Sequence, residues 1–319
     1  MNRSSRILVV GSETLFGAAL ARQLRQQGFS GLIEAAEPDP HFPAAVEEHF
    51  REHRPEVVFL TAGLSGGIGL NRQRPATLMH DNLLTVCHML EAAHRHGVAR
   101  LLYLGSSCMY PREAAQPLRI ESLGTGLLEP TSAPYATARH AGLLLCEAYR
   151  REHGCDFRVA IPANGYGPED DFAPESGHVI PALISRFHEA KRMGAPSITL
   201  WGTGTAVRDF IYADDVAEAC LFLMQKAAVT GPINIGSGLG TSIAELVETL
   251  AQVVGYRGNI EWDASKPDGQ PRKVLDALPL RNLGWRPGRS LSDGLRQTYD
   301  WYLHHVVKEA PRDAHSFVS

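Results

Sequence analysis

The sequence predicts an α/β protein in which a doubly wound parallel sheet is followed by a smaller C-terminal α/β lobe. Strands that are apolar almost throughout alternate with helices over residues 1–163, as expected for a parallel sheet covered on both faces. A glycine-containing loop joins the first strand to the first helix. Past Asn164 the alternation stops at GYGPEDDFAPESG, a segment rich in glycine, proline and acidic residues.

The predicted elements of the sheet follow in order along the chain. Short apolar runs rich in β-branched residues predict strands over 6–10, 32–36, 56–60, 100–107 and 156–162. Helical periodicity, closed by glycine in several cases, predicts helices over 18–28, 43–53, 81–97 and 134–153.

This order defines two parts. We expect residues 1–163, together with a strand near 232–236, to form a dinucleotide-binding domain of the Rossmann type. Residues 164–231 and 237–310, which include a predicted helix near 179–193, form the second lobe, and the two parts enclose a cleft. Residues 311–319 are expected to be a frayed tail.

Composition and charge narrow the class of partner. The chain has 319 residues, of which 44% are hydrophobic, and a formal net charge of −4, so bulk electrostatics favour neither nucleic acid nor a membrane surface. It shows no leader and no apolar run long enough to cross a bilayer. Its five cysteines lack CxxC spacing, so we expect neither a disulfide framework nor a metal site, and a cytoplasmic protein with reduced thiols.

The glycine loop is GSETLFG, with Gly11 at the turn, Thr14 in the middle and Gly17 at the start of the helix. In a dinucleotide fold the first glycine makes the tight turn, the middle one admits the pyrophosphate and the last lets helix and strand pack closely. Thr14 departs from this pattern because its β-branched side chain takes up space near the phosphates. A strand-to-helix turn without a ligand is the alternative.

Acidic residues follow the second predicted strand. The residue that contacts the adenosine ribose lies about 20 residues beyond the glycines, and Glu34 and Glu37 are the candidates. No arginine is near them. If a dinucleotide binds, acid here favours NAD over NADP, although a solvated acidic loop explains these residues equally well.

Several motifs together resemble one family. GSSCMYP (105–111) and YATAR (135–139) are similar to the extended short-chain dehydrogenase/reductases, in which Ser, Tyr and Lys act together. With IPANGYGPEDDF, SGHVIPALISRFHEA, WGTGTAVRDFIYADD and DASKPDGQPRK they resemble the GDP-L-fucose synthase family, over about residues 5–303. That family converts GDP-4-keto-6-deoxy-mannose by 3,5-epimerisation followed by NADP-dependent 4-reduction.

The resemblance implies catalytic roles. Ser106 would donate a hydrogen bond to the C4 carbonyl and Tyr135 would deliver the proton to that oxygen. Cys108 and His178 would be the epimerisation pair, which is chemically reasonable because a thiol and an imidazole can both exchange protons near neutral pH. Taken alone, Cys108 would be interpreted as a small buried residue and His178 as a loop histidine.

The resemblance also implies a GDP-sugar site in the second lobe. Arginine suits a diphosphate because its planar fork donates two hydrogen bonds, and tryptophan can pack on a base or sugar. The residues at the family's GDP-sugar positions are Asn164, Arg186, Trp201, Arg208 and Lys273. Asp214 and Asp215 are expected to cap the following helix. A homodimer is implied, through helices near 82–96 and 134–153.

Position 139 departs from the family, where lysine holds the nicotinamide ribose and assists the tyrosine. Arg139 lies four residues after Tyr135, on the same helix face. It keeps the positive charge, but its longer, planar side chain is expected to position a ribose poorly, and it cannot relay a proton.

Three hypotheses follow. The first is an epimerase/reductase of a GDP-keto-sugar that uses NADP or NAD. The second is an enzyme with the same GDP-sugar site that mainly epimerises, since Thr14 and Arg139 both fall on the cofactor half and would weaken or abolish reduction, or that acts on a related GDP-keto-sugar such as a heptose derivative. The third is a nucleotide-sugar-binding protein without catalysis, which the presence of both Cys108 and His178 opposes.

Overall fold

The computed structural model describes residues 1–173, 177–226, 229, 231–266 and 268–308, and within them it contains the predicted parallel sheet. The order of the five hydrogen-bonded strands is β1-β2-β3-β4-β9, and every pairing is parallel. The strands are β1 (Ile7–Val10), β2 (Val57–Leu60), β3 (Arg100–Leu104), β4 (Phe157–Pro162) and β9 (Ile233–Ile235). The strand predicted near 232–236 therefore does return to the sheet, beside β4.

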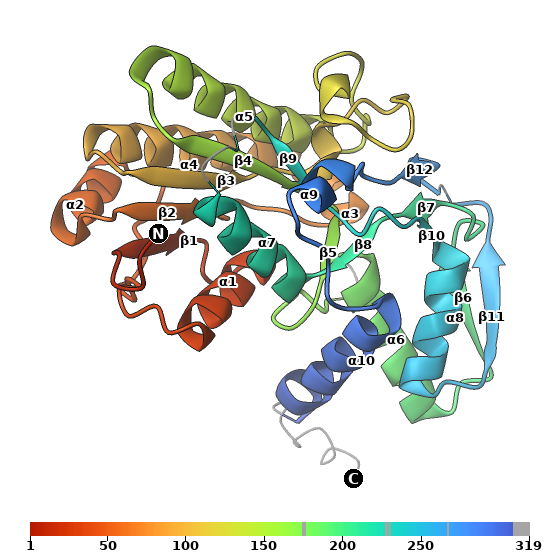
Figure 1. Cartoon of the computed structure of the whole chain (residues 1–319). Helices are drawn as coiled ribbons and strands as arrows, with labels where there is room; N and C mark the ends of the chain where they lie inside the picture. The colour runs from red at the N-terminus through yellow and green to blue at the C-terminus, as the bar shows by residue number, and fades with distance from the viewer. Residues whose placement is uncertain (174–176, 227–228, 230, 267, 309–319) are drawn as a thin grey trace, which may run out of the picture.

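Helices cover both faces of this sheet. Figure 1 shows α4 and α5 on one side and α1 and α7 on the other, which is the doubly wound arrangement. The helices of this part are α1 (Leu15–Gln26), α2 (Pro43–His53), α3 (Ile68–Gln73), α4 (Pro75–Arg95), α5 (Ala133–His153), α7 (Ala213–Gln225) and α9 (Leu278–Asn282). Two 3₁₀ turns, η1 (Ser107–Met109) and η2 (Ile120–Ser122), follow β3.

The predicted second strand over 32–36 is wrong. Only Leu32 pairs with β1, in a single bridge to Ile7, and the chain then leaves the sheet edge. The residues after Ile33 are Glu-Ala-Ala, which have low strand propensity and are exposed, so no apolar face holds them against the sheet.

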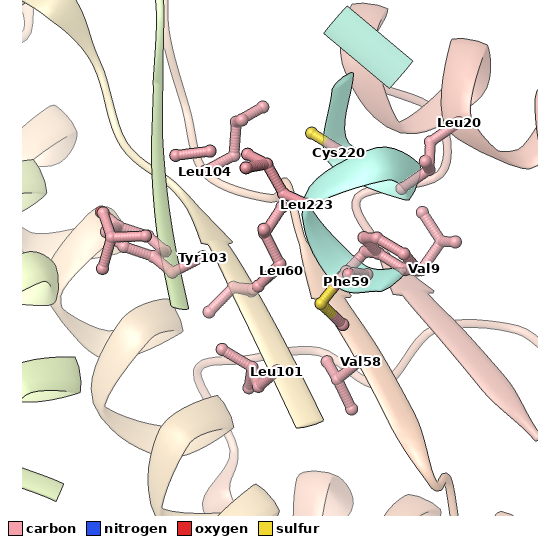
Figure 2. Close-up of a cluster of buried hydrophobic side chains, with 14 of the residues drawn as sticks. Val9, Leu20, Val58, Phe59, Leu60, Leu101, Tyr103, Leu104, Cys220 and Leu223 are labelled. Carbon is pink, nitrogen blue, oxygen red and sulfur yellow. The ribbon is translucent and has the colours of Figure 1, made fainter. Parts of the chain in front are cut away.

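The buried centre of the sheet joins both layers of helices into one core. Figure 2 shows Val9 of β1, Phe59 of β2 and Leu104 of β3 with Leu20 of α1 and Leu223 of α7. Helix α7 thus packs on the sheet, although it lies within 164–231, the stretch assigned to the second lobe. The exact domain boundaries stay a prediction, and the expected tail over 311–319 lies outside the described residues.

A second hydrophobic cluster lies in the C-terminal part, between α6, α8 and α10. The helices there are α6 (Val179–Met193), α8 (Ile243–Val254) and α10 (Leu291–Tyr302), followed by the π-helical turn η3 (Leu303–Val307). Short strands complete it: β5 (Asn164–Tyr166), β6 (Ser197–Trp201), β7 (Val207–Arg208), β8 (Phe210–Tyr212), β10 (Thr241–Ser242), β11 (Asn259–Asp263) and β12 (Arg272–Lys273).

These short strands bring distant residues to the carboxyl ends of the large sheet. Strand β12 pairs in parallel with β7, so that Lys273 lies in register with Arg208. Strand β5, which follows directly from β4, pairs with β8. Asp209, between β7 and β8, is buried and accepts hydrogen bonds from Ser237, Gly238 and Leu275, which ties these strands to the loop after β9. Burial raises the pKa of Asp209, and these bonds offset that only in part.

Candidate active site

The glycine loop after β1 has the tight geometry that the sequence predicts. Gly11 has φ of +88°, and a Cβ there would lie 2.6 Å from the Ala62 backbone. A Cβ on Gly17 would lie 1.9 Å from the Gly11 carbonyl oxygen. Both glycines are therefore required by the packing of the loop against the start of α1 and the end of β2.

Thr14 has a structural role in this loop. It is the N-cap of α1: its hydroxyl donates to the Gly11 carbonyl oxygen at 2.7 Å and accepts from the Gly17 N–H at 3.2 Å. The side chain folds back into the turn to make these bonds. The departure from glycine at the middle position thus gives the helix a hydroxyl cap.

Glu37, rather than Glu34, lies at the glycine loop. Its carboxylate accepts from the backbone N–H of Gly11 at 2.5 Å and of Ser12 at 2.7 Å, and from the Ser12 hydroxyl at 2.6 Å. Glu34 is exposed and pairs with Arg25 at 2.8 Å. The chain leaves the sheet edge after Ile33, and this early departure carries Glu37 to the loop.

Ser106 and Cys108 lie at the carboxyl end of β3. Ser106 is the N-cap of η1, and its hydroxyl accepts from the Cys108 N–H at 3.2 Å. This 3₁₀ turn fixes the distance between the hydroxyl and the thiol. Cys108 is partly buried.

The Cys108 thiol faces a lysine from the far end of the sequence. Lys273 Nζ lies 3.8 Å from Cys108 Sγ. Burial raises the pKa of the Cys108 thiol, but the Lys273 ammonium and hydrogen bonds with Ser106 and Ser132 outweigh it, so the net pKa is lowered. The arrangement therefore favours a thiolate, which is the form of cysteine that accepts a proton.

Tyr135 and Arg139 lie on the first turns of α5, and both are buried. The Arg139 guanidinium carbon is 5.4 Å from the centre of the Tyr135 ring. Its Nη1 donates to the carbonyl oxygen of Ala62, just beyond β2, at 3.0 Å and to that of Leu104, the last residue of β3, at 3.4 Å. The guanidinium is thus tied to the backbone at the edge of the sheet where ligands of such folds bind.

Arg139 still has capacity to bind another group. Its Nε is buried without a partner, and among the described residues no carboxylate lies within ion-pair distance of it. Burial lowers its pKa, but interactions with Tyr135 and Tyr103 outweigh burial and the net pKa is raised. A fully charged, partly unsatisfied donor beside Tyr135 fits a ribose hydroxyl of a dinucleotide.

His178 lies at the start of α6, as its N-cap residue, with a half-exposed side chain. Its Nδ1 is 3.7 Å from Asp170 Oδ1, and the Asp170 carboxylate is almost fully buried. A buried carboxylate at this distance can orient the imidazole. In the described part of the chain, no hydrogen bond or ion pair joins His178 to Cys108.

The candidate GDP-sugar residues differ in their surroundings. Arg208 is close enough to Cys108 for their charges to interact, burial lowers its pKa, and it has no carboxylate partner at contact distance among the described residues. Trp201 is 70% exposed and has the Lys266 ammonium 5.9 Å from its ring centre. Arg186 on α6 donates to the Thr199 carbonyl oxygen, and Asn164 begins β5.

The structure corrects one prediction and adds residues. Asp214 and Asp215 do not cap α7, whose N-cap is Tyr212; they lie in its first turn and pair with Arg22 and Arg289. Sequence analysis missed Ser132 beside the thiol, Asp170 behind His178 and the buried Asp209. The acidic run after Tyr166 and the Arg-Asp pair at 208–209 were the available signals.

Comparison with known proteins identifies the family. Residues 7–236 match the model of the NAD dependent epimerase/dehydratase family. The chain belongs to this family. It is 46% identical over 307 residues to GDP-L-fucose synthase 1 of Arabidopsis thaliana, covering 96% of this chain and 95% of that one. It is 42% identical over 309 residues to GDP-L-fucose synthase of Escherichia coli K12, covering 93% and 96%.

Solved structures of the family share the fold. The GDP-mannoheptose C4 reductase from Campylobacter jejuni with NADP bound has a TM-score of 0.85 and 31% identity, covering 95% of this chain and 99% of that one. A GDP-6-OMe-4-keto-L-xylo-heptose reductase from C. jejuni has a TM-score of 0.88 and 30% identity, with the same coverage.

Within the described residues no helix has the length and apolar character needed to cross a bilayer.

Proposed function

We propose that this enzyme binds a GDP-4-keto-sugar, GDP-4-keto-6-deoxy-mannose or a close relative, epimerises it at C3 and C5, and reduces it at C4 with NAD(P)H. The observation that carries the proposal is the Cys108 thiol, held by the Ser106 turn and 3.8 Å from the Lys273 ammonium. A lowered thiol pKa contributes nothing to core packing, so at the edge of the sheet where ligands bind we interpret this cysteine as a base. The proposal also rests on membership of the NAD dependent epimerase/dehydratase family and on the relatives named GDP-L-fucose synthase.

Epimerisation needs a base and an acid on opposite faces of the sugar. Protons on the carbons beside the C4 ketone are acidic, so a Cys108 thiolate removes one and forms an enolate. His178, oriented by Asp170, returns a proton to the opposite face. Each epimerisation removes one proton from the substrate and returns one, so the substrate charge is unchanged. The thiol that gained a proton and the imidazole that lost one exchange protons with solvent before the next epimerisation.

Reduction uses the other half of the site. When bound, the nicotinamide supplies a hydride to C4. Ser106 donates a hydrogen bond to the C4 oxygen, and Tyr135 transfers its phenolic proton to that oxygen as the alcohol forms. The charged Arg139 beside the Tyr135 ring stabilises the phenolate that remains.

The diphosphate is assigned to the second lobe. Arg208 is a partly buried cation without a carboxylate partner among the described residues, so an anion would satisfy it. Arg186 provides a second fork, and Trp201 offers an exposed ring for the base or sugar to stack on. Asn164 completes the proposed set.

We further propose that the cofactor is NADH rather than NADPH, since Glu37 places a carboxylate on the N–H groups of Gly11 and Ser12. A carboxylate there can accept from the ribose hydroxyls but repels a 2′-phosphate. Glu37→Gln keeps the shape and removes the charge, so it should lower kcat/KM for NADH and raise it for NADPH. Glu34→Gln, on the exposed Arg25 pair, is the matched control and should change neither. Equal effects of the two variants would contradict the assignment.

A second candidate, epimerisation with little or no reduction, is favoured by one observation. Arg139 Nη1 is already committed to the Ala62 and Leu104 carbonyl oxygens, so the guanidinium is held at the sheet edge and adapts to a ribose less readily than a flexible lysine. The two functions differ in the fate of the keto sugar. Consumption of NADH or NADPH with appearance of a 4-hydroxy product supports the first, and Tyr135→Phe should abolish that reduction. Solvent exchange on the sugar carbons without any reduction by the wild-type enzyme supports the second.

The proposed homodimer uses the outer faces of α4 and α5, where Leu144 is 52% exposed. Ala138, Gly142 and Cys146 on α5 are buried within the protomer, so they serve the core rather than an interface. Light scattering after gel filtration should give twice the chain mass, and Leu144→Glu should halve it.

We propose a cytoplasmic location because all five cysteines are free thiols.

A further inference from the structure

Three side chains with metal-binding atoms that have no part in the proposed active site converge on the surface between α2 and α4. His41 comes from the loop before α2, and His80 and Asp81 are neighbours on α4. One ligand atom from each lies within 4.8 Å of the other two. The catalytic scheme uses none of these residues.

The spacing of the ligand atoms matches a small divalent cation. Bonds from zinc to nitrogen or oxygen are about 2.0–2.1 Å, so neighbouring atoms of a tetrahedral site lie roughly 3.3 Å apart. His41 Nε2 is 3.1 Å from Asp81 Oδ1, and His80 Nδ1 is 3.5 Å from the same oxygen. Two of the three distances between ligand atoms therefore already suit zinc. Rotation of the exposed His80 ring can bring its nitrogen to the same distance from His41 Nε2.

A second carboxylate fixes the ring of His41. Asp39 Oδ1 lies 2.7 Å from His41 Nδ1 and also accepts from the His41 backbone N–H at 2.9 Å. A proton on Nδ1, donated to Asp39, leaves the lone pair of Nε2 facing the Asp81 carboxylate. In that tautomer Nε2 and the Asp81 oxygen, 3.1 Å apart, are two acceptors that a cation can bridge in a carboxylate–histidine–metal arrangement, just as a proton bridges them when the ring is charged.

The loop is held against α4 before any metal binds. His88 Nδ1 on α4 lies 2.6 Å from the Pro40 carbonyl oxygen, next to His41 in the chain. The ligands from the loop and from the helix are thus brought together by an independent contact. Such a preformed site costs less conformational entropy on binding than one that the metal must assemble.

We propose that His41, His80 and Asp81 bind one Zn²⁺ or similar borderline divalent cation, with Asp39 orienting His41 and water in the fourth position. Two imidazoles and one carboxylate suit zinc better than Mg²⁺ or Ca²⁺, which prefer oxygen ligands. The bound metal cross-links the 39–41 loop to α4. The spacing of 39 and 40 residues between the ligands explains why no short motif in the sequence indicated this site.

The test is calorimetric titration of ZnCl₂ into the tag-free, metal-stripped full-length protein. We expect one equivalent to be lost, or its affinity to fall at least about tenfold, in His41→Ala and in His80→Ala. His80 is exposed on α4, so its substitution should leave folding unchanged. Asp39→Asn should also weaken this equivalent about tenfold, although Asp39 is not a ligand.

Two controls make the result specific. His304→Ala removes an exposed histidine elsewhere and should leave the zinc isotherm unchanged. Replacing ZnCl₂ by MgCl₂ should abolish binding to the wild type. Zinc isotherms for His41→Ala and His80→Ala that match the wild type in stoichiometry and affinity would overturn the proposal, and so would a wild type that binds no zinc.

Discussion

Replacing Lys273 by methionine should impair proton abstraction by Cys108 without disturbing the fold. The two atoms Lys273 Nζ and Cys108 Sγ are 3.8 Å apart. Coulomb's law gives about 1 kcal/mol for two unit charges at this distance in water and about 4 kcal/mol at an effective dielectric constant of roughly 20. Loss of even the smaller of these stabilisations would lower the thiolate population about sixfold, since about 1.4 kcal/mol corresponds to a factor of ten.

The assay is the rate at which GDP-4-keto-6-deoxy-mannose takes up deuterium from D₂O without reduced cofactor, measured by mass spectrometry at saturating substrate. The lysine favours the thiolate, so its loss raises the Cys108 pKa. Exchange by Lys273→Met should therefore slow at least about sixfold near neutral pH, and the rising limb of its pH profile should move to higher pH. At high pH the two enzymes should converge.

Two matched variants separate the charge effect from other causes. Lys273→Arg keeps the positive charge and should retain most of the exchange rate. Lys191→Met removes a lysine whose ammonium only donates to the Val254 carbonyl oxygen, and should have no effect on exchange. A Lys273→Met enzyme that is slower by the same factor at every pH would refute the reasoning, because it would show that Lys273 acts on substrate alone.

Three further predictions follow from the same structure. Arg139→Lys should raise kcat/KM for reduction about tenfold, measured by cofactor oxidation, because a flexible ammonium can reach the ribose while the guanidinium is held by the Ala62 carbonyl oxygen. Asp156→Asn should destabilise the fold by about 1.5 kcal/mol in urea, because Arg158 loses its charged partner but keeps its bonds to the Leu223 and Lys226 carbonyl oxygens. Gly142→Ala should cost about 1–3 kcal/mol, since a Cβ would lie 2.6 Å from the Tyr103 ring.

The stability difference between wild type and Asp156→Asn should also depend on pH. Burial raises the pKa of Asp156, but hydrogen bonds from Arg158 and Arg100 outweigh burial and the net pKa is lowered. A lowered folded-state pKa contributes stability above the unfolded value of about 3.9, and this contribution is lost as pH falls through the folded-state pKa. The stability difference between wild type and Asp156→Asn should therefore shrink below about pH 4; a constant difference down to acid unfolding would contradict it.

Much of the large sheet could be predicted from the sequence because its strands are buried on both faces. Such strands are continuous apolar runs, and Val57–Leu60 and Phe157–Pro162 carry that signal unmistakably. The run at 32–36 begins in the same way with Leu and Ile but lies at the sheet edge, where only its first residue is paired. Local composition does not distinguish an edge from a centre, so the strand was predicted too long.

The site was harder to predict where it depends on long-range pairing. Lys273 reaches Cys108 only because the two-residue strand β12 pairs beside β7, and two residues give no periodicity to recognise. Glu37 replaced Glu34 at the glycine loop because the shortened strand changed the path of the chain. The effect of Arg139 depends on the carbonyl groups of Ala62 and Leu104, which no sequence pattern reveals.

The measurement that tests the account most directly is mass spectrometry of GDP-4-keto-6-deoxy-mannose after incubation with the wild-type protein in D₂O, with and without NADH or NADPH. We predict deuterium on the sugar carbons under every condition, and a reduced 4-hydroxy product when reduced cofactor is present. The absence of both deuterium uptake and reduction would contradict the assignment of Cys108, His178 and Tyr135 as catalytic residues. Deuterium uptake with no reduction would contradict the reductase half alone.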